Sequence, residues 1–119
     1  MIDAMPTDCL FCRIAAGEIP AHVVAQDELV VAFRDINPAA PTHVLVIPRA
    51  HVVSAAALGE DDTVLLGRLI AVANQVAASE GIADGGYRLV TNVGDDGGQS
   101  VHHLHLHVLG GRRLSWPPG

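Results

Sequence analysis

The sequence contains no lysine and few aromatic side chains. Its seven basic residues are all arginine, and thirteen Asp and Glu residues bring the formal charge to −6. A chain this acidic is poorly suited to broad contact with the phosphate backbone of a nucleic acid polymer, although a single nucleotide could bind in a local site. Aromatic residues make up 3% of the chain, so we expect a core of Val, Leu, Ile and Ala.

Long apolar runs are also missing. No stretch approaches the ~18 residues of a membrane helix, and residues 1–8 lack the basic start and apolar middle of a secretory signal. We therefore expect a cytoplasmic protein that has no membrane partner. Its 119 residues suit one domain, 1–119. In that domain we expect residues 1–8 to form a flexible N-terminus and residues 112–119 an extended arm, because Pro117 and Pro118 exclude regular structure there.

Cysteine is scarce as well, with two residues in the sequence Cys9-Leu-Phe-Cys12. This spacing is too tight for a disulfide to brace the fold, so it favours metal binding or redox chemistry. A pair of reduced thiols that bind nothing is the plainer alternative. Asp8 can cap a short helix from Cys9 to about Ala16 that ends at Gly17, and on this helix both thiols share a face.

The remaining segments predict several strands and one long helix. Two strands are expected in HVVAQDELVVAFRDI, a third in PTHVLVIPRAH, and others in GYRLVTNVG and in the histidine-rich stretch near residue 105. One long helix is expected from Glu60 to Ser79. Its apolar residues recur at helical spacing, at Leu65, Leu69, Val72 and Val76. These segments together indicate an antiparallel sheet with one long helix.

Histidines at positions 103, 105 and 107 share one face of the last predicted strand, because side chains alternate faces along a strand. The apolar residues between them pack inward, so the histidine face must line something. A solvent-facing strand would more often carry Thr, Lys or Glu. Two chemical interpretations stay open at this point. The imidazoles can hold a metal, or one can attack phosphorus while a neighbour fixes the proton on its other nitrogen.

The loop GDDGGQS, residues 94–100, leads into this strand. Its glycine N–H groups can converge on an anion, and the Ser100 hydroxyl adds another donor. A glycine-rich loop by itself is more often a turn. Beside three histidines it favours phosphorus chemistry.

The run His103-Leu-His105-Leu-His107-Val-Leu resembles the histidine-triad (HIT) motif. The segments FRDINPAAPTHVLVIPRAH, GYRLVTNVG, DGGQSVHHLHLHVLGGR and WPPG look like the Hint branch of that family, the purine nucleoside phosphoramidases. The resemblance extends from about Cys12 to Gly119. It implies an α+β fold, the HIT fold, with a five-stranded antiparallel sheet and one long and one or two short helices. It also implies a homodimer in which two such sheets join into ten strands.

The resemblance also implies roles for individual residues. His105 matches the nucleophile that attacks the α-phosphorus, and His107 matches the partner that contacts phosphate and passes a proton to the leaving amine. We count His43 and Ser100 with them as catalytic, His43 as a member of the histidine hydrogen-bond network. Asp35 matches the carboxylate that holds the ribose. Asn92, Ser100 and the backbone at Val101 match phosphate-contacting positions, and we count Gly98 and Gln99 with them as nucleotide-binding.

The slot for the purine base is implied by six apolar positions, which are Phe11, Ile14, Ile19, Phe33, Ile36 and Leu45. Such residues form ordinary core in most proteins, so both interpretations stay open.

The two cysteines depart from the animal Hint pattern and resemble those of bacterial HIT proteins and of galactose-1-phosphate uridylyltransferases. There, such cysteines hold zinc with two histidines, which match His51 and His103 here. The set Cys9, Cys12, His51 and His103 would close a tetrahedral shell and leave no open position. The implied zinc is therefore structural, and the chemistry needs no metal.

The implied function is hydrolysis of the P–N bond in purine nucleoside 5'-phosphoramidates or acyl-nucleotides. AMP or GMP would be released through a nucleotidyl-histidine intermediate. Two alternatives stay open: a dinucleoside polyphosphate hydrolase, and a nucleotide-binding adaptor without catalysis.

Overall fold

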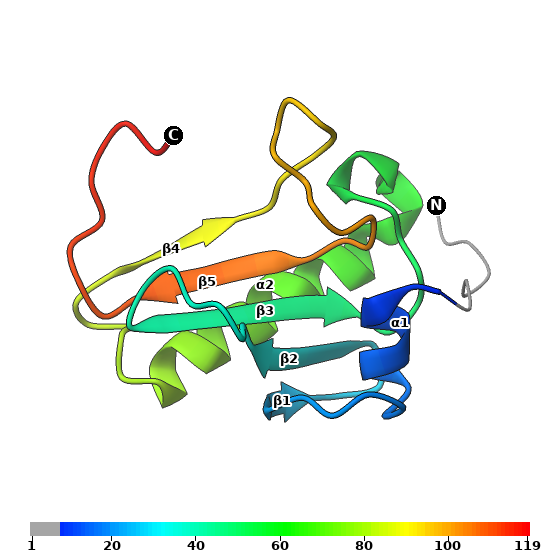
Figure 1. Cartoon of the computed structure of the whole chain (residues 1–119), viewed down its shortest axis with the longest axis horizontal. Coiled ribbons are helices and arrows are strands. Elements are labelled where there is room, and N and C mark those ends of the chain that lie inside the picture. Colours follow the sequence, from blue (N-terminus) through cyan, green and yellow to red (C-terminus); the bar gives the residue numbers. More distant parts are fainter. Residues whose placement is uncertain (1–7) are drawn as a thin grey trace.

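The structure, a computed structural model, describes residues 8–119 and shows one five-stranded antiparallel sheet with helices on its two faces (Figure 1). The predicted flexible N-terminus lies outside the described residues except for Asp8. The helices are α1 (Leu10–Ala15) and α2 (Thr63–Ser79), with short 3-10 turns at Ala55–Ala57 and Glu60–Asp62. The strands are β1 (Val23–Gln26), β2 (Val30–Arg34), β3 (Thr42–Pro48), β4 (Tyr87–Val90) and β5 (Leu106–Gly110), in the order β1-β2-β3-β5-β4. The predicted fold class is confirmed.

The two central strands β2 and β3 are buried on both faces of the sheet. Alternate residues pack against α2 on one face, namely Val30, Ala32, Val44 and Val46. The residues between them form a second cluster with Phe11 of α1 on the other face, namely Val31, Phe33, Leu45 and Ile47. This second face carries the candidate site.

Helix α2 covers the first face, behind the sheet in Figure 1. The four predicted contact residues, Leu65, Leu69, Val72 and Val76, are all buried. The helix begins at Thr63, because Glu60–Asp62 form a separate 3-10 turn. It is the longest helix in residues 8–119, and no helix of this part is long and apolar enough to cross a bilayer.

Besides the start of α2, three predicted boundaries are wrong. Cys9 caps α1 in place of Asp8, since its sulfur accepts the N–H of Cys12 at 3.4 Å. Strand β4 ends at Val90, well before Gly94. Strand β5 begins only at Leu106, after two of the three histidines. The last β3–β5 pair is Val46 with Leu106, although β3 itself continues to Pro48.

The C-terminal residues 112–119, predicted as an extended arm, contain neither helix nor strand. Arg88 of β4 donates a hydrogen bond of 2.8 Å to the carbonyl of Ser115 in this stretch. Trp116 is 81% exposed.

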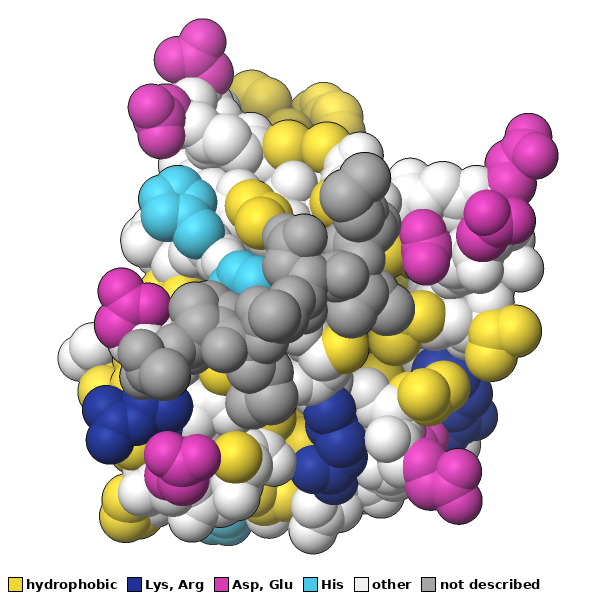
Figure 2. Space-filling model, turned by 90° about the vertical axis from the view of Figure 1, so that its right-hand side faces the viewer, with side chains coloured by type: hydrophobic (Ala, Val, Ile, Leu, Met, Phe, Trp, Pro, Cys, Tyr) yellow, Lys and Arg dark blue, Asp and Glu magenta, His cyan; other side chains and the backbone are white. Residues whose placement is uncertain are grey.

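Charged side chains are mixed on the end of the molecule that Figure 2 presents, where arginines stand apart from one another among acidic residues.

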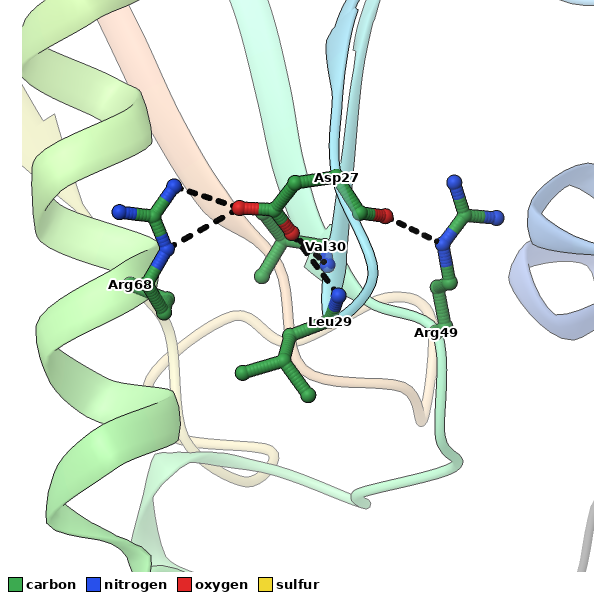
Figure 3. A network of polar contacts seen from close by, with 5 residues as sticks. All are labelled: Asp27, Leu29, Val30, Arg49 and Arg68. Atoms are coloured by element: carbon green, nitrogen blue, oxygen red, sulfur yellow. Dashed lines mark hydrogen bonds and ion pairs between the residues drawn. The ribbon is translucent and has the colours of Figure 1, made fainter.

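Asp27, in the turn between β1 and β2, links three elements (Figure 3). Its carboxylate accepts the N–H groups of Leu29 and Val30 at 2.8 and 2.9 Å, and it pairs with Arg68 of α2. Its own carbonyl accepts from Arg49, which also donates to the carbonyl of Ala15 at the end of α1. The hydrogen bond from Leu29 is the largest of the effects that lower the pKa of this carboxyl.

Replacing Asp27 with Asn should lower the free energy of unfolding by about 2 kcal/mol at pH 7, because charge-assisted hydrogen bonds are lost. The lowered pKa means that this contribution is present above the carboxyl's ordinary pKa and disappears as pH falls through the folded-state value. Urea unfolding at pH 7 and at pH 3 measures both effects. Asp84→Asn, in the exposed loop after α2, is the control. An Asp27→Asn protein as stable as this control at pH 7 would contradict the account.

Candidate active site and metal site

The sheet register places the site. Phe33, Leu45 and His107 are direct partners on β2, β3 and β5, and directly opposed residues of an antiparallel pair lie on the same face. Phe33 and Leu45 belong to the cluster that packs against Phe11. His43 lies two residues before Leu45 on β3 and so shares this face. An apolar wall and two histidines therefore meet on the side of the sheet away from α2.

A first group of four ligand atoms lies beside α1. Cys9 and Cys12 meet His51, which follows β3, and His103, which precedes β5, with all four atoms within 4.8 Å of one another. The Cys12 sulfur is 3.3 Å from Nδ1 of His51, and the Cys9 sulfur is 3.4 Å from Nδ1 of His103. Sulfur and nitrogen ligands of one tetrahedral zinc lie about 3.6 Å apart. The four side chains could therefore hold one ion.

The position of the proton on His103 is the one that a metal ligand requires. Its Nε2 is 2.9 Å from the carbonyl of Pro48, and a carbonyl only accepts, so Nε2 carries the proton. The lone pair on Nδ1 then faces both sulfurs. A metal-bound histidine has this arrangement, with its second nitrogen donating to a carbonyl. Burial lowers the pKa of His103 to about 4, which keeps the ring neutral at pH 7.

Cys12 is buried and its thiol is protonated in the metal-free protein. Burial raises its pKa to about 12, and the neighbouring Cys9 adds to the effect. Binding of a metal must therefore displace this proton, which makes occupancy dependent on pH.

His105 is fixed by the backbone of His103. Its Nδ1 lies 2.7 Å from the His103 carbonyl, so Nδ1 must carry the proton and Nε2 keeps a free lone pair. The edge of the Phe11 ring packs on the imidazole, with ring centroids 5.2 Å apart. The ring is thus oriented by a hydrogen bond and by packing, as a nucleophilic histidine requires.

His107 is oriented by a chain of hydrogen bonds that starts at the backbone. The N–H of Ala39 donates to Nδ1 of His43 at 2.9 Å, so neutral His43 carries its proton on Nε2. That nitrogen lies 2.9 Å from Nδ1 of His107, which must accept. Neutral His107 consequently carries its proton on Nε2. This buried atom has no hydrogen-bond partner in residues 8–119, so its N–H is available to donate to a ligand.

The pKa values support this assignment. Burial lowers the pKa of His43, and it lowers that of His107 to about 4. Nearby histidines lower the pKa of His107 further. Asp35 opposes both shifts, since its carboxylate lies 3.4 Å from Nε2 of His43. Both histidines are neutral at pH 7, and the backbone N–H of Ala39 sets which nitrogen donates and which accepts in this series of hydrogen bonds.

Buried neutral histidines should make the protein less stable in weak acid. Between the unfolded pKa of about 6.5 and a folded pKa of about 4, the unfolded chain binds more protons, so the free energy of unfolding falls as pH falls. His107→Gln should weaken this dependence by about 1 to 2 kcal/mol between pH 7 and pH 5. Urea midpoints of both proteins at the two pH values test this. The same pH dependence in both proteins would show that His107 contributes nothing.

Comparisons with known proteins agree with this geometry. The sequence profile of the HIT domain matches residues 16–114. The chain belongs to the HIT family. It is 50% identical over 115 residues to an uncharacterized HIT-like protein of Synechocystis sp., covering 97% of this chain and 100% of the relative.

Solved HIT structures have the same fold. A HIT family hydrolase from Legionella pneumophila is 53% identical with a TM-score of 0.92, covering 94% of this chain and 100% of that one. A histidine triad protein from Clostridium difficile is 41% identical with a TM-score of 0.90, covering 93% of this chain and 96% of that one.

A pocket of about 450 Å³ adjoins the HIT histidines. Eleven of the predicted nucleotide-binding residues line it, and these are Phe11, Ile14, Ile19, Phe33, Asp35, Ile36, Leu45, Ser100, Val101, His105 and His107. These residues do not separate into core residues and base-slot residues. Phe11, Phe33 and Leu45 belong to a buried cluster and line the pocket as well, whereas Ile36 is 91% exposed.

Three predicted contact residues do not line this pocket, and they are Asn92, Gly98 and Gln99. The Gln99 amide is buried and bonded to protein backbone on both its oxygen and its nitrogen. His43 also does not line the pocket, because it stands behind His107 and touches it through a hydrogen bond.

The pocket has further lining residues that sequence analysis did not predict, namely Leu10, Pro20, Ala21, Arg34 and Asn37. Four of them directly adjoin predicted residues in the chain, so adjacency to Phe11, Ile19, Asp35 and Ile36 was the available signal. The Arg34 guanidinium is paired with Glu80 at the end of α2, at 2.8 Å.

Proposed function

We propose that this HIT protein is a nucleotide-binding hydrolase that cleaves the P–N bond of purine nucleoside 5'-phosphoramidates or acyl-nucleotides and releases AMP or GMP. One observation carries the proposal. His105 lines the pocket and its Nδ1–H donates to the His103 carbonyl, so in the neutral ring Nε2 carries the lone pair that can attack phosphorus. The similarity to a HIT family hydrolase supports the reaction class.

The first step forms a bond between Nε2 of His105 and the α-phosphorus while the P–N bond breaks. The anionic phosphoryl group favours the protonated form of His107, whose Nε2 gives a proton to the leaving nitrogen. In the second step, water bonds to phosphorus through its oxygen and loses a proton to His107. The bond from phosphorus to His105 breaks, and the nucleotide leaves. Covalent catalysis thus divides one difficult displacement into two easier ones.

Substrate binding is expected to use local donors, because the net charge of −6 repels anions at long range. Ser100, Val101 and His107 line the pocket and would contact the phosphate. Asp35 also lines the pocket, and its carboxylate would accept hydrogen bonds from the ribose hydroxyls. The apolar wall formed by Phe11, Phe33 and Leu45 would then hold the purine.

We further propose that Cys9, Cys12, His51 and His103 hold a structural zinc ion. The donor set of two sulfurs and two nitrogens is typical of zinc. Four protein ligands leave no position for water or substrate, so this ion would brace the site and take no part in the reaction. It would fix α1 to the His103 backbone, whose carbonyl orients His105.

A cytoplasmic homodimer completes the proposal. Strand β4 is an edge of the sheet, and unpaired edges are open to pairing with a second chain. Two five-stranded sheets that join at such an edge would give ten strands. Sedimentation of the purified protein as a dimer would support this assembly.

The reaction is tested by comparing substrates. Purified protein should release AMP from adenosine 5'-phosphoramidate much faster than from a diadenosine polyphosphate. The reverse preference would favour the dinucleoside polyphosphate hydrolase. AMP binding with no turnover of either compound would leave the nucleotide-binding adaptor.

A further inference from the structure

The loop between β4 and β5 reaches the pocket at Ser100 and Val101 but has very little packing of its own. Residues 93–98 and Ser100 are all exposed, and Gln99 alone in 93–100 is buried, at 8% exposure. We propose that Gln99 is a positioning residue that holds this loop in its phosphate-binding shape through its buried amide, rather than by touching the nucleotide. The choice of phosphate as ligand rests on the proposed function.

The amide of Gln99 bonds to both ends of the loop. Its oxygen accepts the N–H of Gly94 at 3.0 Å, and its nitrogen donates to the carbonyl of Val101 at 3.0 Å. The remaining N–H donates to the carbonyl of Val53 at 2.7 Å. One side chain therefore closes the loop across its base and fastens it to the segment after His51.

Backbone geometry shows how tightly the loop is folded over this amide. The N–H of Gln99 donates to the carbonyl of Gly94 at 3.0 Å. Gly94 and Gly98 have φ values of 70° and 80°, which favour glycine. A Cβ on Gly97 would lie 2.4 Å from the carbonyl oxygen of Val93. The chain thus makes a compact turn, and its attachment to the rest of the protein depends on the amide.

The segment at Val53, to which the Gln99 amide is bonded, also supports the histidines. Val53 follows Val52, whose carbonyl accepts the N–H of Leu104 at 2.6 Å. Leu104 lies between His103 and His105. The same short segment therefore supports the loop on one side and the nucleophile on the other. Loss of the Gln99 amide should displace the loop while the histidines keep their own support.

Gln99→Met tests this directly, because Met has a similar length and cannot make these hydrogen bonds. We expect the dissociation constant of AMP to rise about tenfold, which corresponds to the loss of roughly 1.4 kcal/mol of binding energy. The dissociation constant of adenosine, which shares the base slot but lacks phosphate, should stay within about twofold of wild type. A merely structural role would change both ligands alike or neither.

Amide hydrogen exchange of the ligand-free proteins gives a second readout that does not depend on the proposed function. Exchange at Gly94 and Gln99 should be faster in Gln99→Met, while α2 is unchanged. Ser54→Ala is the matched control. Ser54 is buried at 7% exposure in the neighbouring segment, and its hydroxyl accepts from Ala56 without touching the loop. This control should keep the wild-type ratio of AMP to adenosine affinity.

Two results would overturn the inference. One is unchanged loop exchange in Gln99→Met, and the other is an equal loss of affinity for AMP and adenosine. If wild type binds neither ligand, the proposed function fails, and the exchange data alone decide whether Gln99 holds the loop.

Discussion

Replacing His105 with Asn is expected to lower the turnover of a fluorogenic adenosine 5'-phosphoramidate by about 10⁴-fold or more, the scale seen when a nucleophile is removed from an enzyme. Asparagine has no ring nitrogen to attack phosphorus, so the covalent route is closed. AMP affinity should change by only a few fold, because the apolar wall and Asp35 remain. Initial rates and AMP titrations on the same samples measure both quantities.

His102→Asn is the matched control for this experiment. His102 adjoins the first triad histidine in the chain, but its side chain is exposed and lines no part of the pocket. The variant should turn over at the wild-type rate. Comparable losses in the two variants would show that the stretch tolerates no change, and full activity of His105→Asn would remove His105 from the mechanism.

Disruption of the proposed zinc site is expected to have the largest effect on the free energy of unfolding. Wild type should contain one zinc per chain, and Cys12→Ser should contain little. The variant should lose about 3 kcal/mol or more of unfolding free energy, because structural zinc contributes its binding energy to folding. Cys12 is 1% exposed and joins α1 to His51 after β3. Metal analysis and thermal unfolding test both points.

A chelator separates the metal from the substitution itself. Stripping zinc should lower the melting temperature of wild type toward that of Cys12→Ser and should leave the variant almost unchanged. A wild-type protein that is purified without zinc, and whose melting temperature does not respond to added zinc or to chelator, would contradict the metal assignment.

Much of the fold could be predicted because the spacing of apolar residues along the sequence indicates which face of a helix or strand is buried. The spacing of Leu65, Leu69, Val72 and Val76 identified α2 and its buried face. The segment between Pro41 and Pro48 was predicted as a strand, and it forms β3, which is buried along its whole length. Six pocket residues were instead predicted from the family resemblance, because nothing in their own spacing distinguishes a base slot from an ordinary core. They are Phe11, Ile14, Ile19, Phe33, Ile36 and Leu45.

Other features could not be predicted because they depend on three-dimensional contacts. The start of β5 at Leu106 depends on its pairing with β3, whose last partner pair is Val46 with Leu106, two residues far apart in the sequence. The protons on His43 and His107 follow from the N–H of Ala39. The bonds of Gln99 join residues up to 46 positions apart. Composition and spacing carry no information about such pairings.

The stereochemical course at phosphorus tests the central claim most directly. A single diastereomer of an adenosine 5'-phosphoramidothioate would be hydrolysed in water enriched in ¹⁸O, and the configuration of the product determined. Two in-line displacements through a nucleotidyl-His105 intermediate predict overall retention. Inversion would show that water attacks the phosphorus directly, and it would contradict covalent catalysis by His105.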